Sequence, residues 1–266
     1  MNAENMNYKK VALAVGAHPD DVEFMMAGTL TLLVRAGYEP HIFSIGNGSC
    51  GTVQLSIEEI VQIRRQEAKK AAEIIGAVYH PGLVNDVEIY YEDRLLRKVA
   101  ALIRELQPEI VLCHSPNDYM EDHQNAARLI VTACFCRGLR NFITDPPLEP
   151  VSHDVYIYHA NPHGNCGPLR ERIDPHIFVD ITDVMAVKER MLRCHESQEH
   201  WLDVSQGMDS YIHTMQDLSR QRAEQCPDKG VKYAEAFRQR LHYGFSSLDR
   251  DRLKEVLGDK VISVVR

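Results

Sequence analysis

Polar residues that could bind a metal ion follow an apolar segment near the start of the chain, in AVGAHPDDVEF (residues 14–24). His18, Asp20 and Asp21 supply one imidazole and two carboxylates there, and a second polar group, HSPNDYMEDH, follows a later apolar segment at 114–123. Two histidines and one aspartate with an open position form a catalytic zinc set, which lowers the pKa of a water to about 7. A carboxylate that is not a ligand can take the proton of that water. The two groups together therefore predict metal-assisted hydrolysis.

Simpler interpretations exist for each polar group taken alone. Two aspartates ahead of a helix often cap its N-terminus and are favoured by its dipole, and Asp122 and His123 could form a solvated helix start. Adjacent carboxylates repel each other, however, and a bound cation would remove that repulsion. Because both groups follow buried strands, their joint occurrence favours the metal site.

Apolar strands and helices alternate through the first half of the chain. The strands are expected at 8–17, 39–45, 77–84 and 109–114, and the helices at 22–37, 56–76, 92–106 and 121–136. This alternation predicts a mostly parallel sheet with helices on both faces. Ligands bind beyond the carboxyl ends of the strands in such sheets, so the two polar groups meet if their strands are neighbours.

Two short sequence patterns add detail to the predicted strands and helices. Ser56 with Glu59 three residues later has the pattern of a capping box, which marks the start of a long helix. The first strand is not followed by Gly-x-Gly-x-x-Gly, so the usual dinucleotide fingerprint is absent. We therefore expect an α/β fold without a nicotinamide or flavin dinucleotide.

The pattern changes after residue 140. Short strands are expected at 155–160 and 176–181, a helix at 181–201 and a last strand at 261–266, with the remainder helical or irregular. We therefore expect one domain over 1–266, with a core over 1–140 and a C-terminal elaboration over 141–266 that contributes to the pocket.

Composition limits the classes of partner. The net charge of −8 argues against nucleic acid or an anionic membrane as a partner. No apolar run approaches the roughly 20 residues of a spanning helix, and MNAENMNYKK at the start lacks the profile of a signal peptide. Seven cysteines without paired spacing indicate buried thiols. A reduced, cytoplasmic protein is therefore expected.

At this point the sequence resembles a known family, the PIG-L/LmbE-like zinc-dependent N-deacetylases. The resemblance rests on His-Pro-Asp-Asp after the first strand and on Asp-His opening a later helix. It extends to three further segments, IRRQEAKKAAEIIG (63–76), HESQ (195–198) preceded by Lys188, and YAEAF (233–237). The resemblance implies a Rossmann-like fold, a homo-oligomer, and hydrolysis of the N-acetyl group of an amino sugar of the N-acetylglucosaminyl type.

The resemblance also implies roles for single residues. His18, Asp21 and His123 would bind Zn²⁺, although Fe²⁺ accepts similar ligands, and Asp20 would be the general base. Many members carry His-Pro-Asp-His at the second motif, where the first histidine steadies the oxyanion or acts as an acid. This sequence has Met120 at that position.

A substitute for the missing histidine is expected elsewhere in the chain. His195 is the first candidate because His-x-Ser-Gln is itself a motif match, and Tyr119 and His114 follow in that order. Tyr119 could equally be an aromatic side chain packed at the sheet edge, and His114 a strand-end residue bonded to the backbone.

Substrate contacts and supporting residues are expected around this site. Arg64 or Arg65 could bind an anionic or sugar group through its planar fork of donors, or could lie on a solvated helix face. Asp86 could accept hydrogen bonds from a sugar or cap a turn, and Tyr119 is a further candidate contact. Asp118 and Asp122 would orient the ligand histidines, as metal-bound imidazoles require. Four other histidines, His153, His159, His163 and His176, lie in the C-terminal third; their clustering could form a wall of the pocket, but surface loop positions are expected.

Two rival functions remain open at the level of sequence. The first is metal-assisted hydrolysis of another bond, such as a phosphoester. Two-metal phosphatases need more ligands than the one set seen here, so this function ranks lower. The second, motivated by Met120, is a non-catalytic protein that binds a metal ion or a sugar.

Overall fold

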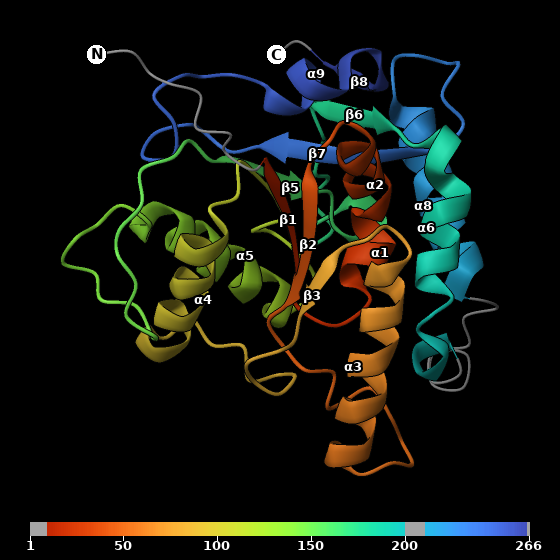
Figure 1. The fold of residues 1–266 in the computed structure, drawn as a ribbon. Helices are drawn as coiled ribbons and strands as arrows, with labels where there is room; N and C mark the ends of the chain where they lie inside the picture. Colours follow the sequence, from red (N-terminus) through yellow and green to blue (C-terminus); the bar gives the residue numbers. More distant parts are fainter. Residues whose placement is uncertain (1–9, 200–210, 265–266) are drawn as a thin grey trace.

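A mixed β-sheet forms the centre of the computed structural model, which describes residues 10–199 and 211–264. Within these residues the strand order is β3-β2-β1-β4-β5-β7-β6-β8 (Figure 1). The parallel strands are β1 (Val11–Gly16), β2 (Glu39–Ser44), β3 (Val78–His80), β4 (Ile110–Cys113) and β5 (Tyr156–Ala160). The antiparallel part contains β6 (Ile177–Asp180), β7 (Ala234–Gln239) and β8 (Val261–Ser263).

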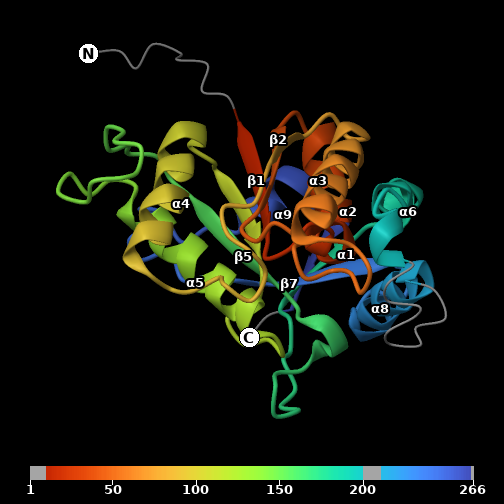
Figure 2. The same cartoon turned by 90° about the horizontal axis from the view of Figure 1, so that it is seen from below.

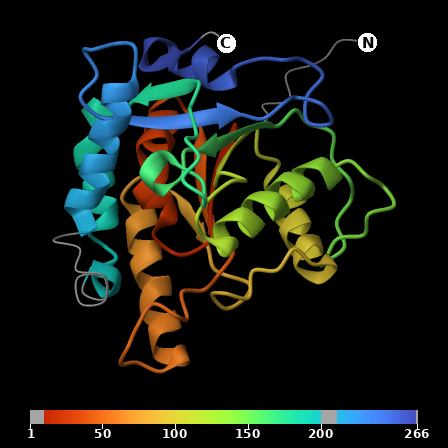
Figure 3. The same ribbon diagram turned by 180° about the vertical axis from the view of Figure 1, so that it is seen from behind.

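Helices cover both faces of this sheet, as the sequence predicted (Figure 2). One face carries α1 (Asp21–Met25), α2 (Ala27–Arg35), α3 (Ile57–Glu73), α6 (Met185–Leu192) and α8 (Tyr211–Gln225). The other face carries α4 (Asp93–Leu106) and α5 (Glu121–Cys136), while α9 (Arg252–Leu257) lies beside β8. In the front and back views, α6 and α8 lie side by side, away from α4 and α5 (Figures 1 and 3).

The hydrophobic core accordingly forms two layers, one on each face of the sheet. Side chains of a strand alternate between the two faces, and β1 shows this plainly. Ala12 and Ala14 pack into the layer beneath α2, whereas Leu13 and Val15 pack beneath α4 and α5. The first strand is therefore buried on both faces, which explains its continuous apolar sequence.

The strand order brings the two polar groups together. β1 pairs with β2 on one side and with β4 on the other, so the order of strands reverses beside β1. The carboxyl ends of β1 and β4 are neighbours at this switch point, which is where ligands bind in open α/β sheets. The adjacency that the predicted site requires is thus present.

Local signals account for several helix boundaries. Ser56 caps α3 in the expected capping box, since its hydroxyl accepts from the Glu59 amide and the Glu59 carboxylate accepts from the Ser56 amide. The helix expected at 22–37 is interrupted at Met26, where α1 ends and α2 begins. The carboxylate of Glu235 accepts from the free amides of Gly28 and Thr29 at this new N-terminus.

Two predictions in the C-terminal part are wrong. Residues 234–239 form β7 within the sheet, where no strand was expected, because a short segment buried on both faces lacks the alternation typical of an exposed strand. The helix expected over 181–201 stops at Leu192 and resumes at 196–199, and the intervening turn carries His195 into the interior. Residues 200 and 201 of that prediction lie outside the described residues, as do 265 and 266 of the expected last strand. In the described part, that strand ends at Ser263.

No helix in the described ranges is long and apolar enough to cross a membrane.

Candidate metal centre and active-site cavity

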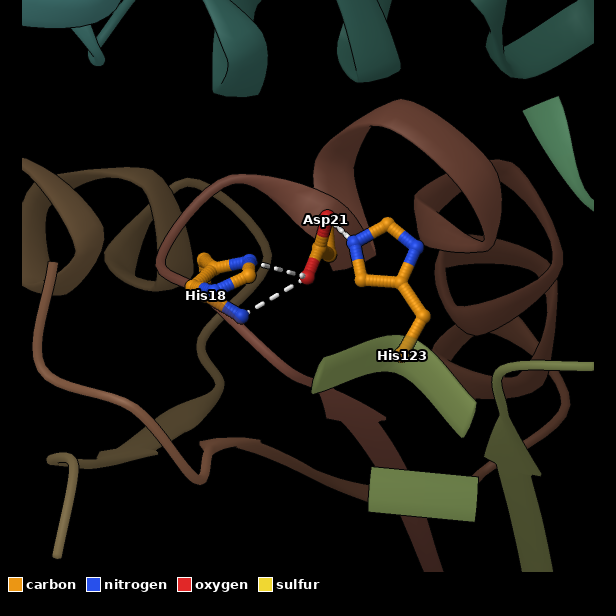
Figure 4. A group of neighbouring side chains, drawn as sticks. All are labelled: His18, Asp21 and His123. Atoms are coloured by element: carbon orange, nitrogen blue, oxygen red, sulfur yellow. Dashed lines mark hydrogen bonds and ion pairs between the residues drawn. The ribbon is translucent and has the colours of Figure 1, made fainter. Parts of the chain in front are cut away.

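Three side chains from the loops after β1 and β4 point toward one another (Figure 4). Asp21 opens α1 and lies between two imidazoles, that of His18 in the preceding turn and that of His123 in the first turn of α5. The Asp21 carboxylate lies 3.6 Å from Nδ1 of His18 and 3.4 Å from Nε2 of His123. Ligand atoms of the three residues all lie within 4.8 Å of one another.

The backbone at Asp20 explains how two adjacent aspartates avoid facing each other. Asp20 has φ 114°, a left-handed conformation that side chains other than glycine rarely adopt. As a result Asp21 faces the two histidines, whereas the Asp20 carboxylate accepts a hydrogen bond from Tyr211 on α8. Although Asp20 occupies the N-cap position of α1, its side chain makes no capping hydrogen bond. Simple helix capping therefore does not account for this pair.

Two further carboxylates hold the ligand histidines from behind. Nε2 of His18 lies 2.9 Å from Oδ2 of Asp122, and Nδ1 of His123 lies 3.0 Å from Oδ1 of Asp118. A carboxylate can only accept, so these outer nitrogens carry the protons and the inner nitrogens are left with lone pairs. The backbone amide of Val87 donates to the same oxygen of Asp122 at 2.7 Å. These contacts are the ones that metal-binding histidines require.

Electrostatics also favour a cation at this point. Burial lowers the pKa of His18, but the hydrogen bond to Asp122 and the charge of Asp21 outweigh it and raise the pKa to about 10. Burial acts to raise the pKa of Asp21, yet His123 and His114 hold it well below the usual range. Without a metal ion this pKa keeps a second proton on the inner nitrogen of His18, and a divalent cation such as zinc would take the place of that proton. Two imidazole nitrogens and one ionised carboxylate would then be the ligands, a set that zinc accepts.

His114 lies beside this group and supports it. Its Nε2 accepts from the Ala17 amide at 3.0 Å and lies 3.0 Å from Oδ2 of Asp21. The ring stacks on His123 with 4.0 Å between centroids. A second donor set of His114, Asp118 and His123 shares His123 with the first. Because Asp118 accepts a hydrogen bond from Nδ1 of His123, the residues of the second set support the first set and do not form a separate metal site.

A cavity of about 660 Å³ opens beside these residues at the carboxyl ends of the parallel strands. Its lining includes residues from the loops after all five parallel strands and from α8. These residues are His18, Asp20, Asp21, Phe24, Met25, Cys50, Gly51, Arg64, Asp86, Val87, Tyr119, Met120, Glu121, His123, His163, Gln198 and Tyr211.

Arg64 forms the charged wall of the cavity. It is almost fully buried, and its guanidinium lies 3.2 Å from Oδ2 of Asp20 and 3.9 Å from Oδ2 of Asp86. Asp86 accepts from the amides of Gly48 and Cys50, so it also holds the loop after β2 in place. Gly48 has φ 84° there, and a Cβ at this position would lie 2.5 Å from Arg64. Glycine therefore allows the loop to pass against the arginine.

Contacts across the interior explain two of the motifs noted in the sequence. Glu67, one turn after Arg64 on α3, accepts from both the amide and the hydroxyl of Ser197. Gln198 donates to the carbonyl of Gly51 at 3.0 Å and lines the cavity. The Arg-x-x-Glu and His-x-Ser-Gln segments thus dock on each other and form one wall of the cavity.

His195 has a different environment from the one expected. It is fully buried, does not line the cavity, and has Nε2 3.5 Å from Oε1 of Glu23. Burial acts to lower its pKa, but the charges of Glu23 and Asp20 raise it. His195 therefore lies behind Asp20, where it could act on that carboxylate but does not reach the cavity.

The other residues singled out in the sequence divide into two groups. Arg64, Asp86 and Tyr119 line the cavity, whereas His114 is buried behind it and Arg65 is exposed on α3. The lining residues that the sequence did not assign to the site include Phe24, His163, Gln198 and Tyr211. His163 is exposed, as expected, and it also lines the cavity beside Phe24 and Tyr119, with ring centroids 5.8 and 6.1 Å away. The surface position expected for His159 is wrong, because this residue is buried in β5. No sequence motif marks Tyr211, so only the packing of α8 reveals it.

Comparison with known proteins gives one family. Residues 13–134 match the family described as PIG-L, GlcNAc-PI de-N-acetylase. The chain is 32% identical over 205 residues to a diacetylchitobiose deacetylase of Thermococcus kodakarensis, with 73% of this chain and 72% of the relative covered. It is 30% identical over 205 residues to a 4-oxalmesaconate hydratase of Pseudomonas putida, with 74% and 77% covered.

Among solved structures, a 4-carboxy-2-hydroxymuconate hydratase of Pseudomonas putida superimposes with a TM-score of 0.74 at 25% identity. The match covers 91% of this chain and 99% of that one. The described architecture is therefore shared with a complete protein of known structure.

Proposed function

The chain belongs to the PIG-L family, and on that premise we propose that it is a metal-dependent hydrolase that removes an N-acetyl group from an amino sugar. The observation that carries the proposal is the set of His18, Asp21 and His123 with Asp20 beside it in one cavity. The relative named diacetylchitobiose deacetylase supports an acetylated amino sugar as substrate.

Each residue of this set has its own role in the proposed reaction. His18, Asp21 and His123 would hold a zinc ion, and this ion would supply the Lewis acidity that polarises an amide carbonyl and acidifies water. Asp20 accepts a proton from the attacking water, for which its position in the cavity next to a ligand residue is suitable. It then gives this proton to the nitrogen as the carbon–nitrogen bond breaks.

A donor to the oxyanion is also needed, because Met120 cannot supply one. We propose the hydroxyl of Tyr119, which lines the cavity with its ring against His123 at 5.5 Å. Burial, with the charge of Asp21, raises the pKa of Tyr119 to about 12, so the hydroxyl keeps its proton. His195, the first candidate from the sequence, is assigned a different role. From behind Asp20, where Glu23 holds it, His195 lowers the pKa of the Asp20 carboxylate against the burial that raises it.

The charge of the cavity favours a neutral amide over an anionic substrate. Among residues 10–199 and 211–264, Arg64 is the one lysine or arginine in the lining, and two carboxylates already neutralise it. Residues 200–210 contain neither lysine nor arginine. A substrate such as 4-carboxy-2-hydroxymuconate carries several carboxylates, and each needs a partner when it is desolvated.

Hydration of a carbon–carbon double bond is nevertheless the second candidate, because one similar sequence and one similar structure, both from Pseudomonas putida, are named as hydratases. The two functions are separated by one assay of the zinc-loaded protein. We expect acetate release from N-acetylated amino sugars and no loss of double-bond absorbance from 4-carboxy-2-hydroxymuconate. The opposite result would assign the chain to the hydratases, and zinc binding without either reaction would indicate a binding protein.

The role of Asp20 is tested by Asp20→Asn. We expect this variant to retain its metal and to lose about 10²- to 10⁴-fold in kcat, the usual contribution of general acid–base catalysis. Asp180→Asn is the matched control, because Asp180 pairs with Lys260 far from the cavity. Elemental analysis of both variants checks metal content, and unchanged turnover in Asp20→Asn would refute the role.

The identity of the metal is a separate proposal. We propose zinc on the basis of the two imidazoles and one carboxylate, with Fe²⁺ as the alternative that accepts the same ligands. Elemental analysis of protein purified without added metal separates the two.

We also propose a cytoplasmic homo-oligomer. All seven cysteines lie in the described part of the chain and are free, which suits a reducing compartment. Self-association is supported by apolar side chains exposed near the start of α3, namely Val53, Leu55, Ile57 and Ile63. Light scattering of the purified protein and fractionation of the source cells test the two statements.

A further inference from the structure

We propose that Tyr211 is a positioning residue that fixes one oxygen of Asp20 and so selects the other as the atom that exchanges protons. This inference rests on the proposed function, because it assigns a part of the same reaction. It concerns a residue of α8 that no motif of the sequence marks and that lies 191 residues from its partner.

The two oxygens of Asp20 have different surroundings. Oδ2 accepts from the Tyr211 hydroxyl at 2.6 Å and lies 3.2 Å from Nη2 of Arg64. Within the described ranges, no hydrogen bond or ion pair involves Oδ1. Asp20 lines the cavity, so Oδ1 is the oxygen left for the substrate side.

Tyr211 is well placed to hold its partner still. Its side chain is 4% exposed and packs against Phe24, with 5.4 Å between ring centroids. α8 itself packs on β7 and β6, and therefore the phenol is anchored in the core of the C-terminal part. The left-handed backbone of Asp20 brings the carboxylate to this fixed donor.

The chemical consequence is a defined path for one proton. An O–H bond of the attacking water breaks and the proton bonds to Oδ1, which leaves Asp20 neutral, while the hydroxide adds to the amide carbon. The same proton later moves from Oδ1 to the nitrogen as the carbon–nitrogen bond breaks, and Asp20 becomes an anion again. Throughout, Oδ2 stays an acceptor for Tyr211, so the carboxylate does not rotate between the two transfers.

A crystal structure of the zinc-loaded protein tests the geometry without any assay of activity. We expect Oδ1 of Asp20 to lie within about 3.2 Å of a water beside the zinc, with Oδ2 still bonded to Tyr211. The proposal is overturned if Oδ2 faces that water or if Tyr211 has turned away from Asp20.

Kinetics of Tyr211→Phe provide the second test, with Tyr38→Phe as the matched control. Tyr38 also donates to a carboxylate at 2.6 Å, that of Glu109, but does not line the cavity. We expect Tyr211→Phe to keep its zinc and its KM and to lose about 10- to 100-fold in kcat, as is typical for a supporting partner. Tyr38→Phe should leave kcat unchanged.

The double variant Asp20→Asn/Tyr211→Phe separates positioning from a general structural effect. Because Tyr211 acts through Asp20, its loss should add little to the loss already caused by Asp20→Asn. A full further decrease, or a kcat for Tyr211→Phe equal to that of Tyr38→Phe, contradicts the proposal. If wild-type protein releases no acetate from any amide, the proposed function fails, while the crystal structure still decides the orientation of Asp20.

Discussion

Two of the buried charge clusters in the described part of the chain are built differently. In the first, His18, Asp21 and His123 gather at the edge of the cavity. In the second, Lys188 of α6 donates to Glu235 of β7 at 2.6 Å, and both side chains are fully buried. The two oxygens of Glu235 also accept from the amides at the start of α2.

In the second cluster, called the closed cluster below, the charged groups have hydrogen-bond partners within the protein. The first cluster, called the open cluster below, leaves ligand atoms facing one another. The carboxylate of Glu235 has a protein partner for each oxygen, and the pair joins three elements, α2, α6 and β7. The first cluster leaves two imidazole nitrogens and a carboxylate facing one another, and it is bordered by two residues in the left-handed region, Asp20 and Val87. Strain and unmet ligand atoms of this kind are typical of functional sites. The same interior thus holds one cluster that joins elements of the fold and one that is a candidate metal site.

The largest effect on stability is expected from Glu235→Ala, which leaves Lys188 buried without a partner. Breaking a buried ion pair from one side costs about 3–5 kcal/mol, so urea unfolding of the metal-free protein should shift strongly. Glu189→Ala is the control, because Glu189 pairs with Arg193 near the surface and such pairs contribute about 0–1 kcal/mol. Equal shifts for the two variants would mean that the closed cluster has no special role.

A substitution in the open cluster should lower the affinity for the metal ion and leave the stability of the metal-free protein nearly unchanged. Asp118→Asn weakens the partner that holds Nδ1 of His123, and loss of such a partner typically costs 10- to 100-fold in metal affinity. Competition with a chelator measures this, and urea unfolding without metal should change little. Asp217→Asn, at an exposed pair with Arg220, is the control. A zinc affinity of Asp118→Asn equal to that of the wild type would show that Asp118 does not support the metal site.

The smallest effect is expected at Val87, where φ is 66° and the side chain is 63% exposed. Glycine removes strain of about 1–3 kcal/mol at an entropic cost of about 0.5–1 kcal/mol, so Val87→Gly should raise the free energy of unfolding by about 1 kcal/mol. Its amide still donates to Asp122, and zinc affinity should therefore stay the same. Val53→Gly, at another exposed valine without a positive φ, should not be stabilising. A loss of stability in Val87→Gly would show that the open cluster is not strained there.

Much of the site was accessible from local sequence. The two polar groups were identified because they directly follow buried strands, and a parallel sheet collects such positions at one edge. The family resemblance then selected His18, Asp20, Asp21 and His123 within these groups. The start of α3 was also predictable, since the capping box of Ser56 and Glu59 involves neighbouring residues only. Both inferences depend on interactions within a few residues or on the regular geometry of the sheet.

Other features depended on which distant segments meet. The β7 strand was missed, and the motif around Glu235 was recognised without its purpose, because its partners are the amides of α2 and the ammonium of Lys188. His195 was expected in the cavity, but the turn that follows α6 buries it beside Glu23. Periodicity and motif spacing describe a segment and do not describe the surface on which it packs.

The sequence by itself determined the types of residue at the ends of the strands and the alternation of strands and helices, and hence the prediction of a metal site in an α/β domain. Only the tertiary structure decided that β1 lies beside β4, that Tyr211 meets Asp20, and that His195 lies behind the cavity. The physical reason is the distance along the chain over which each kind of interaction acts. Backbone hydrogen bonds and side-chain periodicity act over a few residues, whereas contacts between distant segments form only when two complementary surfaces are packed together.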